Sequence, residues 1–374
     1  MKIALVHDYL KGEGGAEQVL LALHEIYPNA PIYTIFSSIQ KTSTLAEKFK
    51  NATIIESWFG KLPYKERLIS PLRFLIPLVW KSFDFSPPAG GYDLIISSAS
   101  WAITKGLGGR KVKEICYCHT PPRYLYGYET SRHWKKHWFI RIYASVVNLP
   151  MRQYDFTQAQ KVTWFIANSE EVARRIQKFY RRDSVVIYPP VEIKMRGEKS
   201  TERKGTYFLT GGRLEMPKNF DLIIRAFELL NLPLKIYGVG PQEEYLRSLS
   251  QKGVEFLGLV SDEEKQKLLS GCRAFICAAT DEDFGITPLE AQACGRPVVA
   301  FRGGGYLETV IEGKTGEFFD KPTPESLASV LKKFKPEKYK AQDCFDQAAK
   351  FSKERFKKEI QNFVKKKYAG TTRS

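Results

Sequence analysis

Three features that mark other classes of protein are missing from this chain of 374 residues. No apolar run approaches the roughly 20 residues that a helix needs to cross a bilayer, so we expect no membrane-spanning helix. The six cysteines follow neither a disulfide framework nor the paired spacing of a zinc site, which favours reduced thiols and a cytoplasmic location. The chain opens directly on a strand-like run, Lys2 to His7, so we expect no signal peptide.

Acidic residues are scarce relative to basic ones, and the formal net charge is +17. A charge of this size attracts phosphates, an acidic lipid surface or nucleic acid. The basic residues do not gather on one repeated module, and the chain has no recognised nucleic-acid-binding motif. We therefore expect no nucleic-acid partner, and we keep phosphates and an anionic membrane surface as candidate partners.

The chain is longer than one hydrophobic core usually serves, which predicts two domains. Strand-like and helix-like segments alternate along it, as they do in α/β proteins with parallel sheets. The run Pro189-Pro190-Val191 closes one strand-like segment, and a charged, weakly hydrophobic stretch, 192–204, follows it as a linker. We place the first domain at 1–191 and the second at 192–350, followed by a helical segment, 351–374.

Two acids lie eight positions apart in a segment with the pattern of a strand, a loop and a short helix. The apolar run Ala274 to Ala279 predicts the strand, and Thr287 suits the N-cap of the helix. Glu282 then lies on the loop and Glu290 in the first helical turn. In open α/β sheets, ligands bind in the crevice beyond the carboxyl ends of the strands, where both acids are expected. Two other interpretations stay open, because Thr287 and Glu290 have the spacing of a capping box and Glu282 would serve equally as a solvated loop charge.

Two cations, Arg213 and Lys218, lie five residues apart between a strand-like segment, 206–210, and the start of a helix. Gly211 and Gly212 precede them in the same turn. Fixed cations in such a turn would stabilise the negative charge that builds on a departing diphosphate. A solvated basic loop is the alternative.

The first half of the chain has a glycine turn and a histidine at the ends of predicted strands. Gly14 and Gly15 lie in a strand-to-helix turn where a phosphate can approach backbone amides. The dinucleotide-binding fingerprint fails there, since Glu17 occupies the position of its third glycine, and a structural turn is equally compatible. His119 ends another strand, at the edge where ligand sites gather, although a lone histidine is more often structural.

Two segments interleave basic and aromatic residues, Asn51 to Ser86 and Arg132 to Arg152. Such a texture suits contact with an anionic lipid surface. The alternative is that the aromatic side chains pack internally and the charges are solvated.

Several of these motifs together resemble those of the family 4 retaining glycosyltransferases. The pattern Glu282-x7-Glu290 has Phe284-Gly285 within it and Ala293-x-Gly295-x-Pro297-Val298-Val299 around its end. The runs 14–17, 119–123 and 211–218 are similar to other family motifs. The resemblance implies a GT-B fold, in which two Rossmann-like, doubly wound α/β domains face each other across a cleft. It places the acceptor on the N-terminal domain and the donor on the C-terminal one, and it returns the final helix, 351–374, to the N-terminal domain.

The resemblance also implies a role for each candidate residue. Glu290 would bind the ribose, Glu282 would hold hydroxyls of the transferred sugar, and His119 would orient that sugar. The remaining donor-binding residues would contact the diphosphate, and they are Gly14, Gly15, Arg213, Lys218, Gly285, Ile286 and Thr287. The family mechanism lets the departing phosphate take the acceptor's proton, so no protein base is required. The sequence offers no metal motif, and we expect activity without a divalent cation.

Two stretches, Val6 to Tyr9 and His119 to Arg123, most resemble mannosyltransferases of bacterial surface-polysaccharide synthesis. The resemblance implies GDP-mannose as substrate, no resident cofactor, and a lipid-linked or polysaccharide acceptor. It also implies a cytoplasmic enzyme that associates peripherally with the inner face of the cell membrane. The alternatives are a UDP-sugar donor and a GT-B sugar-nucleotide epimerase.

Overall fold

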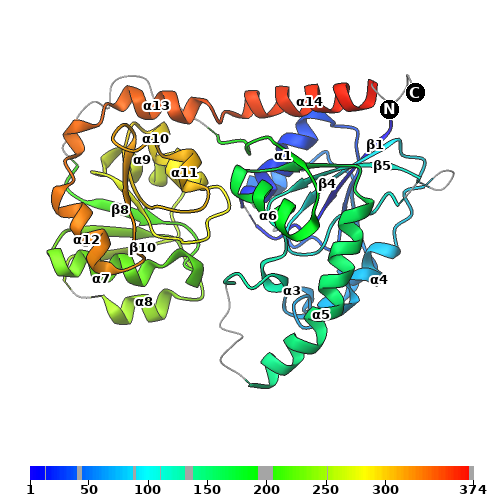
Figure 1. Cartoon of the computed structure of the whole chain (residues 1–374), viewed down its shortest axis with the longest axis horizontal. Coiled ribbons are helices and arrows are strands. Elements are labelled where there is room, and N and C mark those ends of the chain that lie inside the picture. The colour runs from blue at the N-terminus through cyan, green and yellow to red at the C-terminus, as the bar shows by residue number, and fades with distance from the viewer. Residues whose placement is uncertain are drawn as a thin grey trace. The chain divides into compact units, whose positions relative to one another are not determined.

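The computed structural model describes residues 1–12, 14–39, 44–86, 90–109, 111–130, 138–192, 205–250 and 252–369. These residues form two compact units (Figure 1). The first unit contains the described residues of Met1–Tyr128, Trp134–Pro190 and Lys353–Ser374, and the second contains those of Glu129–His133 and Val191–Ser352. All but the first residue of the predicted linker, 192–204, lies outside the described residues.

The first unit is built on a seven-stranded sheet in which every described pairing is parallel. The strand order is β3-β2-β1-β4-β5-β6-β7. Successive side chains of a strand point to opposite faces, so Ile3 and Leu5 of β1 enter one core cluster while Ala4 and Val6 enter another. The strands are β1 (Ile3–His7), β2 (Ile32–Thr34), β3 (Ile54–Glu56), β4 (Leu94–Ala99), β5 (Lys113–Cys118), β6 (Trp164–Ala167) and β7 (Ser184–Val186).

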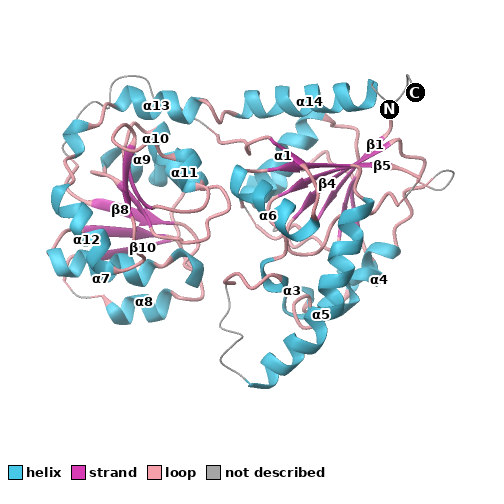
Figure 2. Cartoon of the chain, in the orientation of Figure 1, coloured by secondary structure: helices cyan, strands magenta, loops and turns pink. Residues whose placement is uncertain are grey.

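Helices cover both faces of this sheet (Figure 2). The longest described helix of the chain is α5, and α14 lies beside α1 (Figure 1). Lys353 and Lys357 of α14 both pair with Glu25 of α1, the second at 2.6 Å. The helices and 3-10 turns of the unit are α1 (Gly15–Ile26), α2 (Thr44–Lys48), η1 (Trp58–Lys61), α3 (Lys65–Leu68), η2 (Arg73–Leu75), α4 (Ile76–Lys81), η3 (Arg123–Leu125), α5 (Trp138–Lys161), α6 (Glu170–Tyr180) and α14 (Lys353–Ala369).

The second unit repeats the design with a six-stranded parallel sheet in the order β10-β9-β8-β11-β12-β13. Its strands are β8 (Phe208–Gly211), β9 (Leu234–Tyr237), β10 (Val254–Gly258), β11 (Phe275–Cys277), β12 (Val298–Phe301) and β13 (Gly316–Phe319). Its helices and 3-10 turns are η5 (Met216–Lys218), α7 (Phe220–Leu230), α8 (Glu243–Leu249), α9 (Asp262–Gly271), α10 (Ile286–Ala293), α11 (Tyr306–Thr309), α12 (Pro324–Lys333), η6 (Pro336–Lys338) and α13 (Ala341–Ala349).

The strand order fixes where a ligand site can form in each unit. The order reverses between β1 and β4 in the first sheet and between β8 and β11 in the second. On either side of such a switch point, the connections between strands run in opposite directions. This leaves a crevice beyond the carboxyl ends of the strands. The prediction of two parallel-sheet, Rossmann-like domains is confirmed, and each domain has one such switch point.

The described residues include no helix long and apolar enough to cross a membrane. None of the six cysteines, all of which lie within the described residues, forms a disulfide, and five of them are buried. Burial raises the pKa of the Cys272 and Cys277 thiols to about 12, so both stay protonated near neutral pH.

Candidate active site

An acid and a cation meet at the switch point of the second unit. The Lys218 Nζ donates to Glu282 Oε2 at 2.6 Å, with Lys218 at the end of η5 and Glu282 in the loop after β11. The Asn219 amide donates to the carbonyl of Ala278 at 2.9 Å and ties the loop after β8 to the end of β11. Glu282 is therefore no solvated loop charge, since its side chain is 15% exposed and bonded.

The loop that carries Glu282 rests on a glycine turn and a buried tyrosine. The backbone N–H of Gly305 donates to the carbonyl of Glu282 at 2.9 Å, and a Cβ on Gly304 would collide with the same carbonyl oxygen. The Tyr306 hydroxyl donates to Glu282 Oε2 at 3.3 Å. Burial raises the pKa of Tyr306 far above its usual value, so the phenol stays a donor at physiological pH. The triple glycine, Gly303 to Gly305, thus brings backbone against backbone and positions the acid.

The helix after this loop starts two residues earlier than the sequence pattern suggests. The N-cap of α10 is Gly285, in the left-handed conformation at φ 92°, and no side chain caps the helix. The prediction of Thr287 as N-cap is wrong, and so is the capping-box interpretation of Glu290. A left-handed backbone favours glycine, and Gly285 has no side chain that could compete for the amides of the first turn. Those amides, which include Ile286 and Thr287, are oriented as in helix N-termini that bind anions.

Glu290 lies in the second turn of α10, not in the first as expected. Its Oε1 accepts a hydrogen bond from Lys265 Nζ at 3.0 Å. Burial acts against charge on Lys265, but attraction to Glu290 outweighs it and raises the lysine pKa. Lys265 belongs to α9, whose N-terminus has a complete capping box between Ser261 and Glu264. The second acid therefore also has a lysine partner.

Arg213, the other predicted phosphate ligand, lies on the loop that follows β8. Its Nε is 2.7 Å from Glu215 Oε1, and its side chain is 69% exposed. The structure thus brings Lys218 to Glu282 but pairs Arg213 with an acid of its own loop.

The switch point of the first unit holds two histidines joined through one hydroxyl. Ser98 Oγ lies 3.0 Å from His7 Nδ1 and 2.8 Å from His119 Nε2. Burial lowers the pKa of His7, so this ring is neutral at neutral pH. The predicted histidine, His119, therefore lies at the carboxyl end of its sheet and is fixed by a serine of the neighbouring strand.

A buried carboxylate, Asp8, follows β1 at the same switch point. It accepts hydrogen bonds from the Ser100 hydroxyl at 2.9 Å and from the backbone amides of Trp101 and Ala102 at 2.6 and 3.0 Å. The Thr104 hydroxyl is a further donor. These bonds fold the loop after β4 around Asp8, which makes the carboxylate a structural anchor.

The glycine turn of the first unit is present where expected. Gly14 is the N-cap of α1 in an extended conformation, without a capping side chain, and Gly15 is the first helical residue. A Cβ on Gly14 would come within 2.6 Å of Glu17 Oε2, so the acid at the missing third glycine lies against this turn.

Some aromatic residues of Asn51 to Ser86 are buried and others are exposed, so internal packing applies to some of them and an interfacial role to others. Phe59, Trp80 and Phe85 are buried in the core, which favours internal packing for those three. Tyr64 is 77% exposed and Phe74 is 47% exposed, as an interfacial segment requires. In the second segment, 132–137 lie outside the described residues, and the described part belongs to α5.

Sequence reasoning missed the residues that hold the acids in place, Asn219, Lys265 and Tyr306. The triple glycine was a signal for Tyr306, because three glycines in a row indicate a close backbone approach. In the part of the chain that the structure describes, no group of three or more His, Cys, Asp or Glu side chains could hold a metal ion. The roles of the candidate residues and activity without a divalent cation stay predictions.

Two family models together match most of the chain. The model described as Glycosyltransferase Family 4 matches residues 14–194, and the model described as Glycosyl transferases group 1 matches residues 192–351.

Curated relatives are similar over part of their length. The alpha-1,3/1,6-mannosyltransferase ALG2 of Dictyostelium discoideum is 28% identical over 291 residues, which are 65% of this chain and 66% of that protein. The GtfA subunit of a UDP-N-acetylglucosamine–peptide N-acetylglucosaminyltransferase from Streptococcus pneumoniae is 28% identical over 160 residues, 40% of this chain and 32% of that protein. The chain thus spans about one third to two thirds of the length of these relatives.

Solved structures of the same fold cover nearly all of the chain. Anabaena Alr3699/HepE in complex with UDP gives a TM-score of 0.71 at 19% identity, over 98% of this chain and 100% of that one. Sucrose-phosphate synthase from Thermosynechococcus elongatus gives 0.72 at 16% identity, over 99% and 100%. These neighbours assign the GT-B fold.

Proposed function

We propose that this chain, whose two halves match the models of Glycosyltransferase Family 4 and Glycosyl transferases group 1, moves a hexose, with mannose favoured, from a nucleotide diphosphate sugar to a lipid-linked or polysaccharide acceptor. The observation that carries the proposal is the contact between Lys218 and Glu282 beside the uncapped N-terminus of α10. An ammonium group and backbone amides suit phosphate oxygens, and a carboxylate suits sugar hydroxyls.

The proposed chemistry uses each of these groups once. The bond between the anomeric carbon and the diphosphate breaks, and Lys218 and the amides of Ile286 and Thr287 stabilise the charge on the leaving oxygen. The acceptor oxygen bonds to the same face of the sugar, and its proton passes to the departing phosphate. Glu282 holds the sugar and Glu290 holds the ribose, each after its lysine partner has turned toward the ligand.

The proposed identity of the donor rests on limited similarity. Mannose is favoured because ALG2 proteins of Dictyostelium discoideum and Mus musculus, both named as mannosyltransferases, are similar over 65% and 61% of the chain. A UDP-sugar is the rival, since the HepE structure contains UDP. A thermal-shift panel of GDP, UDP, ADP and their sugar conjugates separates them. A ligand at about 100 times its Kd adds roughly 2.7 kcal/mol to folded-state stability.

The same panel on two variants tests the site itself. We expect Glu290→Gln to lose most of the shift given by the preferred nucleotide. Glu325→Gln, which removes an exposed acid of α12, is the matched control and should keep the full shift. A full shift with Glu290→Gln would refute the assignment of the ribose to this acid.

Turnover distinguishes the remaining alternatives. A transferase needs an acceptor, whereas an epimerase would isomerise the donor without one. We expect turnover to persist in excess chelator, and loss of turnover that magnesium restores would show that a metal is required. We place the enzyme peripherally on the cytoplasmic face of the membrane, where a lipid-linked acceptor would be found.

A further inference from the structure

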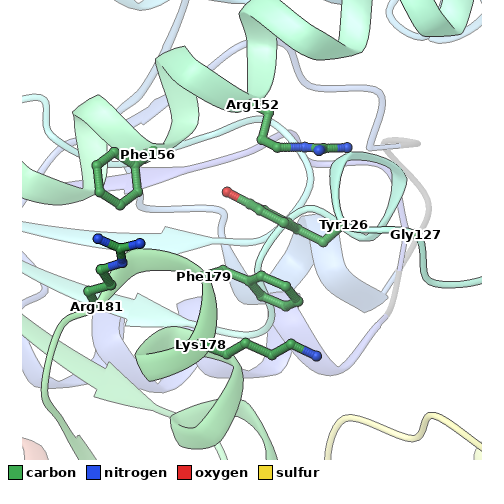
Figure 3. A pocket seen from close by; sticks show the side chains of 7 residues that line it. All are labelled: Tyr126, Gly127, Arg152, Phe156, Lys178, Phe179 and Arg181. Atoms are coloured by element: carbon green, nitrogen blue, oxygen red, sulfur yellow. The ribbon is translucent and has the colours of Figure 1, made fainter.

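A hollow of about 630 Å³ opens on the first unit between α5 and α6. Three aromatic and three cationic side chains line it, namely Tyr126, Phe156, Phe179, Arg152, Lys178 and Arg181. Figure 3 shows the rings of Tyr126 and Phe179 between Arg152 and Lys178, with Arg181 beside Phe156 on the other side of the hollow. The rings of Tyr126 and Phe179 are stacked, with their centroids 4.2 Å apart. The hollow therefore concentrates positive charge around an apolar surface.

Among the described residues, no acid forms an ion pair with a cation of the hollow. Among the described residues, Lys178 and Arg181 form no ion pair, and Arg152 donates through Nε to the carbonyl of Leu125 at 2.8 Å, with no carboxylate partner. The one acid of α5, Asp155, is fully buried and already bound by Lys105 and Tyr126. An anion that enters the hollow would thus meet unneutralised positive charge.

A helix C-terminus attracts cations without any ligand, and α6 ends beside this hollow. That explanation applies to Lys178, in the last turn of α6, and to Arg181 at its C-cap. It does not account for Arg152, which belongs to α5, or for the three rings between the cations. The composition of the hollow thus needs another cause.

The hollow lies at the end of an exposed apolar stripe along α5. Trp138 is 71% exposed, Ile142 57%, Val146 67% and Leu149 70%, and their spacing places them on one side of the helix. Arg152 and Phe156 of the hollow continue that side one turn and two turns beyond Leu149. The other exposed side chains beside the stripe include Arg141 and no carboxylate.

Two further exposed apolar side chains lie in η2 and α4, a segment that is hydrogen-bonded to α5. Arg73 donates to Asn148 Oδ1 at 2.9 Å, and Phe74 and Leu78 nearby in the chain are 47% and 55% exposed. Apolar surface of this extent is uncommon on a monomeric protein that faces only water, and it marks interaction sites.

We propose that the hollow binds the phosphate of a membrane lipid headgroup while the α5 stripe lies among the hydrocarbon chains. Along α5, the exposed apolar side chains are followed by the cations of the hollow. This order matches the hydrocarbon chains and the phosphate of such a lipid. The charge is complementary to an anionic bilayer surface, and an amphipathic helix with aromatic and basic residues is suited to the interface. The inference rests on the proposed function, since it specifies how a lipid-linked acceptor is held.

Flotation of the full chain with vesicles tests the proposal. The vesicles contain phosphatidylcholine alone, or with phosphatidic acid or phosphatidylglycerol at matched surface charge. We expect binding in the order phosphatidic acid, phosphatidylglycerol, then phosphatidylcholine, because the first exposes a phosphomonoester. The Arg152→Gln/Arg181→Gln variant should reduce binding about fivefold per removed charge and abolish the preference for phosphatidic acid. The Ile142→Ser/Leu149→Ser variant should weaken binding to every vesicle by about tenfold or more.

Matched controls remove an exposed leucine or an exposed lysine of the second unit, Leu229→Ser and Lys332→Gln, and should bind like the parent chain. Unchanged flotation of both test variants, or equal binding of the parent chain to all three vesicles, overturns the proposal. Binding of single-stranded DNA that needs Arg152 and Arg181, without vesicle binding, also overturns it. The nucleotide-induced thermal shift is measured on the same variants, so failure of the lipid site is distinguished from failure of the donor site.

Discussion

The two sheets have the same kind of topology but treat charge at their switch points differently. In the first unit, Asp8 is buried and takes its hydrogen bonds from the protein itself. In the second unit, Glu282 and Glu290 are 15% and 24% exposed, and each is held by one lysine. A buried acid enclosed by backbone amides is committed to the fold, whereas a partly exposed acid held by a lysine can exchange that partner for a ligand. The comparison supports the proposal that the donor binds in the second unit.

The largest expected effect concerns another buried charge of the first unit, the ion pair between Lys105 and Asp155. Asp155→Ala leaves Lys105 buried without its carboxylate, since the two side chains are 0% and 1% exposed. Removing one partner of a buried pair costs about 3–5 kcal/mol, and urea denaturation should show this loss. The control, Glu255→Ala, breaks the exposed pair with Lys235 and should cost about 1 kcal/mol or less. Equal losses in both variants would contradict the contrast between buried and exposed charge.

The second largest effect concerns Glu282, the partly exposed acid of the second unit, and we expect it in the catalytic activity. Glu282→Gln keeps the shape of the side chain but weakens its bond to Lys218 and to a sugar hydroxyl. We expect kcat/KM to fall by about 100-fold or more, with little change in unfolding free energy. Glu325→Gln is the control with unchanged kcat/KM. Near-parental activity of Glu282→Gln would remove this acid from the mechanism.

The glycine turn that supports Glu282 gives a smaller effect. Gly304→Ala places a Cβ against the carbonyl of Glu282 at a backbone φ of +56°, and should cost about 1–3 kcal/mol of stability together with activity. Gly313→Ala is the matched control, since its φ of +70° gives similar strain but no atom lies within 4 Å of the added Cβ. If both variants lose activity equally, strain alone is responsible and Gly304 does not position the acid.

Local sequence patterns predicted the elements of both sheets well. Continuous apolar runs mark the buried parallel strands, and the predicted strand Lys2 to His7 corresponds to β1. The helix start at α10 was mispredicted because Thr287 has a high preference for N-caps, whereas the loop geometry places Gly285 there. Propensity describes single residues, and the position of this cap depends on the contact of the loop with Gly304 and Tyr306.

The candidate site was only partly predictable for a related reason. The spacing of Glu282 and Glu290 is visible in the sequence, but their partners Lys218 and Lys265 lie 64 and 25 positions away. Side chains so distant in sequence meet only after the sheet order is fixed. The sequence singles out Arg132 to Arg152 as a candidate interfacial segment, but it does not say whether the apolar face of that segment is covered.

The smallest expected effect is a change in the pH dependence of folding stability, which comes from His7 at the first switch point. Burial lowers the pKa of His7 from 6.5, so the folded ring stays neutral where the unfolded chain binds a proton. Stability from this group is complete above about pH 6.5 and falls as pH drops below it, by up to about 1.4 kcal/mol per pH unit until the lowered pKa is reached. Urea denaturation of the parent chain and His7→Gln between about pH 7 and 5 should therefore give a shallower slope for the variant. The segment Val191–Ser352 contains no histidine, so binding of nucleotide at Lys218 and Glu290 should lack a histidine titration. An identical dependence of stability on pH in parent and variant would show that His7 is not held neutral. The titration of His7 would then no longer distinguish the first switch point, whose polar groups bond to the protein, from the second, whose acids can bind a ligand.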